Sequence, residues 1–130
     1  MSEQENQATG GNGSGNSDTY TDLTYLREMA NGDEEFVLKM VNTYLENTPQ
    51  ALDDLEVAAK EENMDRLRAI AHKMKQSIEF MGISSIKETA TQIEHYAKED
   101  ENIDNLATMV EQVVDVSKKA MEELRRDISN

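Results

Sequence analysis

The chain contains no cysteine and no tryptophan, and only one proline and two phenylalanines stand among its 130 residues. Without cysteine, disulfides, thiol nucleophiles and thiolate metal ligands are excluded. No run of about eighteen apolar residues is present. The polar N-terminus also lacks the basic and apolar stretches of a signal peptide. We therefore expect neither a membrane span nor a signal peptide, and we predict a soluble cytoplasmic protein.

Basic residues are scarce, with 13 lysines and arginines against 27 acidic residues and a net charge of −14. Such an acidic chain is not expected to bind nucleic acid or an anionic membrane, because both require a basic surface. The basic residues are nevertheless concentrated in residues 66–75, which contain no acid. We call this group the basic cluster: Arg66, Arg68, Lys73 and Lys75. Charge clustering alone favours an ordinary solvated helix face over a functional site.

Glycine is also sparse outside the first part of the chain, since four of the six glycines lie in residues 1–19. Met1 and Ala8 are the apolar residues of this segment. It cannot bury enough surface to offset its ordering entropy, so we expect a disordered tail over residues 1–19. Residues 20–130 are then a single domain of ordinary size.

Helical periodicity dominates from residue 20 onward. A short helix is expected over residues 23–30, ended by Gly32, and a long one follows with Asp33 as its N-cap. Apolar residues stay in phase across Pro49, which predicts one kinked helix rather than two. The residues of this long helix that stay in phase are Val41, Leu45, Thr48, Leu52, Leu55 and Ala59.

Three more helices are expected in the second half of the chain. One begins at residues 63–65 and ends at Gly82, and the next begins at Ser84 or Ser85, with Glu88 completing a capping box. The last begins at about residue 103. No β-type alternation occurs. Four helices of about 16 to 28 residues with short connections predict an all-α fold, an antiparallel up-down four-helix bundle with a short additional N-terminal helix.

His72 is predicted on the face of its helix that lies opposite the apolar stripe. The apolar stripe of this helix comprises Leu67, Ile70, Ala71, Met74, Ile78 and Met81. At about 100° per residue, His72 points roughly 150° away from the middle of that stripe. The side chain is therefore expected in solvent at mid-helix, with Arg68 and Lys75 one turn away.

Most site chemistries find no support in this sequence. No residue pattern marks a nucleophilic triad, and no Gly-rich phosphate loop is present outside the tail. A di-iron bundle needs Glu-x-x-His pairs, but Ala69 precedes His72 and Gln92 precedes His95 at that spacing. We expect no metal site, and we interpret His95 as an ordinary surface residue.

An exposed imidazole suits phosphoryl chemistry. A neutral ring nitrogen is nucleophilic near pH 7 and can accept a phosphoryl group from an aspartyl phosphate. Because the product carries roughly two negative charges, cations one helical turn away stabilise it. Lys75 and Arg68 have the spacing for this role.

Residues 71–77, followed by the Phe-Met-Gly-Ile of residues 80–83, resemble the signature of histidine-containing phosphotransfer (HPt) domains. The resemblance extends over about residues 20–129 and implies a four-helix bundle whose exposed histidine relays phosphoryl groups between receiver-domain aspartates. It further implies that His72 is phosphorylated and that Lys75 lies near the phosphate. In one departure, Gln76 replaces the glycine most common in the family, and we interpret it as a phosphate hydrogen-bond donor or a determinant of partner choice.

The resemblance leads us to expect a monomeric bacterial phosphocarrier rather than an enzyme. Its partners would be response-regulator receiver domains and hybrid histidine kinases, docking on the exposed face that includes Ala69 and Glu79. It would need no cofactor of its own, with Mg²⁺ bound by the receiver. Two alternatives stay open: an adaptor that binds a receiver or kinase without accepting phosphate, and an oligomerisation domain built on the helix of residues 103–129.

Overall fold

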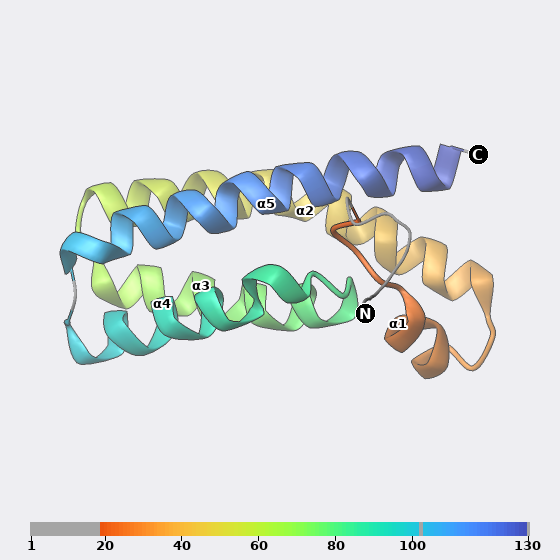
Figure 1. The fold of residues 1–130 in the computed structure, drawn as a ribbon, viewed down its shortest axis with the longest axis horizontal. Helices are drawn as coiled ribbons and strands as arrows, with labels where there is room; N and C mark the ends of the chain where they lie inside the picture. The colour runs from red at the N-terminus through yellow and green to blue at the C-terminus, as the bar shows by residue number, and fades with distance from the viewer. Residues whose placement is uncertain (1–18, 102, 130) are drawn as a thin grey trace, which may run out of the picture.

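The computed structural model of the chain describes residues 19–101 and 103–129 (Figure 1). Apart from Thr19, the predicted tail lies outside these residues. The elements are α1 (Thr24–Met29), α2 (Glu34–Lys60), α3 (Met64–Phe80), the 3₁₀ helix η1 (Ser84–Ile86), α4 (Lys87–Glu99) and α5 (Ile103–Ser129). Within the described residues, no helix is long and apolar enough to cross a bilayer.

Four helices form an up-down bundle in which each packs against its neighbours in the chain, and α5 closes the ring against α2. Because α2 and α5 have 27 residues each, against 17 in α3 and 13 in α4, the two longer helices project beyond one end of the bundle (Figure 1). The short α1 packs beside the projecting part of α2. The predicted fold class is therefore confirmed.

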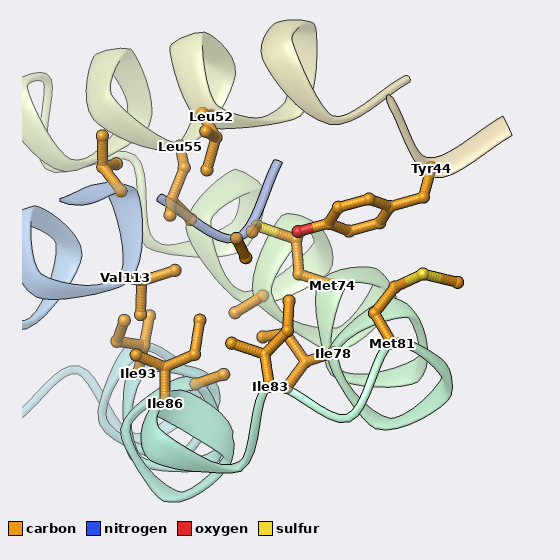
Figure 2. Close-up of a cluster of buried hydrophobic side chains, with 14 of the residues drawn as sticks. Tyr44, Leu52, Leu55, Met74, Ile78, Met81, Ile83, Ile86, Ile93 and Val113 are labelled. Carbon is orange, nitrogen blue, oxygen red and sulfur yellow. The ribbon is translucent and has the colours of Figure 1, made fainter. Parts of the chain in front are cut away.

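The predicted stripes supply the core. Figure 2 shows side chains of α2, α3, η1, α4 and α5 meeting between the helices. Leu52, Leu67, Ile78, Ile93 and Leu124 each expose 1% or less of their surface. Burial of this kind contributes about 1.5–3 kcal/mol per large apolar side chain. Ile128, in the last turn of α5, is instead 37% exposed.

Among the described residues, two hydroxyl groups without partners are buried in this core. The Tyr44 hydroxyl points inward among apolar side chains (Figure 2), and neither it nor the buried Ser117 hydroxyl has a hydrogen-bond partner in the described structure. Burial raises the pKa of Tyr44 to about 12, against a smaller opposing effect of the neighbouring Thr48 and Ser117 hydroxyls.

The predicted starts of two helices are confirmed. The Asp33 carboxylate accepts a hydrogen bond from the Phe36 N–H at 3.2 Å, and the Asn63 side chain accepts one from the Arg66 N–H at 3.2 Å. Each caps a donor that the helix itself leaves unpaired. Pro49 lies inside the continuous α2, whose two halves run in different directions in Figure 1, as the unbroken stripe predicts.

The predicted start of the fourth helix was wrong. Residues 84–86 form the separate turn η1, and α4 begins only at Lys87, so it is shorter than the expected 16 residues. Neither element has a side-chain cap, and the capping box with Glu88 does not form. Ile83 and Ile86 are fully buried whereas Ser85 is exposed, so packing of the two isoleucines decides this turn rather than serine capping.

The residues that precede α1, Thr19–Leu23, form what we call the N-terminal strap. Its attachment to α5 is the buried carboxylate of Glu123, which accepts hydrogen bonds from the Tyr20 N–H at 2.9 Å and the Thr21 N–H at 2.8 Å. The Thr21 hydroxyl donates a third bond to Glu123. At the end of α3, the Asp22 N–H donates to the Met81 carbonyl at 3.0 Å. The strap thereby joins α5 to α3.

Candidate functional site

His72 lies in the middle of α3 and faces solvent. The helix buries Leu67, Ala71, Met74 and Ile78, and this fixes the opposite face outward. The His72 side chain is 61% exposed. The exposure predicted from the periodicity of this segment is therefore observed.

The partner of His72 comes from the neighbouring helix. Because α3 and α4 run antiparallel along each other, α4 places Glu94 opposite His72. The Nδ1 atom of His72 lies 2.7 Å from Oε2 of Glu94. The other oxygen, Oε1, lies 2.6 Å from Nζ of Lys75. One carboxylate thus bridges the imidazole and the lysine through its two oxygens.

The charge state of Glu94 sets the tautomer of His72. The hydrogen bond from Lys75 is the main cause that lowers the pKa of Glu94, with burial opposing it and His72 adding to it. The carboxyl group is therefore ionised near neutral pH and can only accept hydrogen bonds. The proton of a neutral imidazole must then be on Nδ1, so the lone pair is on Nε2. This arrangement leaves Nε2 as the nucleophilic nitrogen.

The basic cluster is partly neutralised in the structure. Arg66 forms an ion pair with Asp54 at 3.3 Å, which links α3 to α2. The charge of Arg66 is therefore paired with α2 and is not directed toward His72. Lys75 pairs with Glu94. Within residues 19–101 and 103–129, Arg68 and Lys73 have no ion-pair partner. Lys73 lines the groove between α2 and α3, whereas Arg68 lies on the exposed face one turn before His72.

The remaining predicted site residues lie where the helical spacing puts them. Ala69, Gln76 and Glu79 are all exposed on α3. In the described part of the chain no hydrogen bond joins Gln76 or Arg68 to the imidazole, so the structure brings only Lys75 and Glu94 together with His72. Glu94 was not among the predicted site residues, whereas His95 next to it is exposed, as expected.

A comparison with protein-family models matches the Hpt domain over residues 39–128. The chain belongs to the Hpt domain family. Searches of curated proteins and of solved structures gave no significant match. The family assignment means that this Hpt domain serves histidine phosphotransfer in a phosphorelay and interacts with receiver domains or kinases. Hpt domains are phosphotransfer intermediates and typically not autonomous enzymes.

Proposed function

We propose that His72 is the phosphoryl acceptor and donor of this Hpt domain, in exchange with receiver-domain aspartates. The observation that carries the proposal is the exposed imidazole held through Nδ1 by the ionised Glu94. No other histidine of the described residues has this arrangement, since His95 has only an edge contact with Tyr96.

In the transfer, the Nε2 lone pair attacks the phosphorus of the aspartyl phosphate. The P–N bond forms while the P–O bond to the aspartate breaks, and the aspartate leaves as a carboxylate. The ring keeps the proton on Nδ1 and becomes positively charged, and the adjacent Glu94 carboxylate stabilises that charge. In the reverse direction the protonated ring leaves readily, so the same contact supports onward transfer.

We assign the phosphate-stabilising role to Lys75, Arg68 and Gln76, which lie within one helical turn of His72. Because Lys75 is paired with Glu94 in the unphosphorylated domain, part of its charge must be redirected when the phosphoryl group arrives. Gln76 supplies an amide donor where an approaching receiver meets α3. We propose docking over the exposed face of α3, including Ala69 and Glu79.

The partner receiver supplies the phosphorylated aspartate and the Mg²⁺ in this scheme. Response-regulator receiver domains and hybrid histidine kinases are the partners that we propose for a monomeric carrier. Its cytoplasmic location and bacterial origin stay predictions from the sequence.

The test is phosphoryl transfer from receiver domains charged with labelled acetyl phosphate in the presence of Mg²⁺. The wild type should acquire acid-labile, base-stable label, and His72→Gln should acquire none. His95→Gln is the matched control, since it removes an exposed histidine from the adjacent helix and should be labelled normally. Label on His72→Gln would refute the assignment. Receiver binding without label on the wild type would favour the adaptor alternative.

A second variant tests the role of Glu94. Glu94→Gln keeps an acceptor oxygen for Nδ1 but removes the charge, so transfer should be about tenfold slower. This corresponds to the difference of about 1.4 kcal/mol between a charged and a neutral hydrogen bond. An unchanged rate would show that the bridge has no part in the transfer.

A further inference from the structure

A hollow lies at the projecting end of the bundle. It has a volume of about 620 Å³ and is lined by the N-terminal strap, α1, α2 and α5, whereas His72 and Glu94 lie on α3 and α4. We call it the end groove.

The floor of the end groove is apolar. Val37 and Val41 of α2 are 3% and 1% exposed and lie one turn apart, so the floor runs along the axis of α2. Leu38 and Ile128 form exposed apolar edges, at 45% and 37% exposure. Exposed apolar side chains of two helices therefore border the same hollow.

The rim of the end groove is acidic. Asp22, Glu34 and Asp127 line it together with a single cation, Arg27, which is paired with Glu34 at 3.1 Å. Hydrogen bonds from Thr24 lower the pKa of Asp22, so this carboxylate is ionised at neutral pH.

The arginines near the end of α5 do not line the end groove. Arg125 and Arg126 line a different hollow, with Glu122 and Ser129. The end groove therefore presents an apolar floor within a negative border.

We propose that the end groove binds a cationic amphipathic helix of a partner protein. A helix with apolar residues at i, i+3 and i+4 matches a floor that runs along α2, and lysines or arginines at its flanks match the acidic rim. A second copy of this chain is a poor occupant, because each copy carries a net charge of −14. Residues 1–18 are also a poor occupant, since Met1 and Ala8 are their only apolar residues.

The probe for this proposal is a peptide of about 15 residues, or four helical turns, with leucines along one face and lysines elsewhere. The control peptide has the same composition with the leucines distributed around the helix. Each is titrated into the ¹⁵N-labelled full chain, and amide shifts locate the bound surface. Leu38→Ser and Ile128→Ser test the edges of the groove. Val57→Ser is the matched control, because Val57 is equally exposed at 45% on the far half of α2.

Amide shifts should concentrate in the strap, the first two turns of α2 and the last turn of α5. Each edge variant should bind the probe about tenfold more weakly, as expected for the loss of one apolar contact, and Val57→Ser should bind as the wild type does. Equal binding of the control peptide would reduce the effect to charge attraction and overturn the proposal. In the absence of peptide, groove amide shifts that depend on the protein concentration would assign the end groove to a second copy of the chain. Also without peptide, a change in the amide shifts of residues 1–18 caused by Ile128→Ser would assign the groove to the chain's own N-terminal residues. Either result would also overturn the proposal, and neither bears on the role of His72.

Discussion

Replacement of Gly82 by alanine tests how the end of α3 is joined to the rest of the bundle. Gly82 has a φ of +65°, a conformation that costs a residue with a Cβ about 1–2 kcal/mol. A Cβ at this position would also lie only 2.0 Å from the Asp22 carbonyl oxygen, and 2.8 Å from the Asp22 nitrogen. The N-terminal strap must therefore move away from α3.

That movement breaks the hydrogen bond from the Asp22 N–H to the Met81 carbonyl, at a cost of about 1 kcal/mol. The expected total loss for Gly82→Ala is about 2–3 kcal/mol of unfolding free energy, measured by urea denaturation. This is a large share of the 5–15 kcal/mol that is typical of a whole domain.

Gly32→Ala is the matched control. Gly32 also has a positive φ, +84°, but a Cβ there would meet nothing within 4 Å. This variant should lose only the backbone component of about 1–2 kcal/mol. Equal losses for the two variants would refute the argument, since they would show that the strap does not press against Gly82. Hydrogen exchange of the Asp22 amide should accelerate in Gly82→Ala and stay unchanged in Gly32→Ala.

Three further variants test single contacts. Lys75→Gln should raise the pKa of Glu94 toward its ordinary value, followed by ¹³C NMR of the carboxyl group. Since the fold lowers this pKa, the ionised carboxylate stabilises the wild type at pH values above the ordinary pKa of 4.5, and that contribution is lost as the pH falls through the lowered pKa. An unchanged titration midpoint of Glu94 in Lys75→Gln would contradict the contact between the two side chains. Tyr44→Phe should leave the unfolding free energy unchanged or raise it by up to about 1 kcal/mol, because the buried hydroxyl has no hydrogen-bond partner. A fall of about 1 kcal/mol in the unfolding free energy from urea denaturation would show that the hydroxyl does form a hydrogen bond. Glu123→Gln should lose about 1–3 kcal/mol, because the amide group places a donor against the N–H groups of the strap. Faster hydrogen exchange of the Thr21 amide should accompany this loss, and unchanged exchange would refute the attachment.

Much of the fold could be predicted because the helical stripes are continuous. A stripe that stays in phase across Pro49 specifies one helix, and the position of His72 opposite its own stripe specifies an exposed side chain. These are local properties of one helix, so the sequence is sufficient for them. The predicted start of α4 was wrong because it depends on packing between elements and not on one helix alone. Burial of Ile83 and Ile86 overrides the capping preference of the nearby serines.

The contacts of the site could not be predicted in the same way. Glu94 meets His72 only because of the register of α3 against α4, which depends on the turn between the two helices. Glu123 is a similar case, since a carboxylate on a charged surface helix gives no sign that it will be buried under the strap. The available signal for Glu94 was weak: an acid next to the apolar Ile93, on the helix that follows the one carrying His72.

The measurement that tests the central claim most directly is NMR of the domain after phosphorylation by a receiver. With ¹⁵N-labelled histidine, coupling between phosphorus and the ring nitrogens identifies both the residue and the atom that carry the phosphoryl group. We expect coupling to Nε2 of His72, with the proton on Nδ1 retained opposite Glu94. Coupling to Nδ1, or to a nitrogen of His95, would contradict the account.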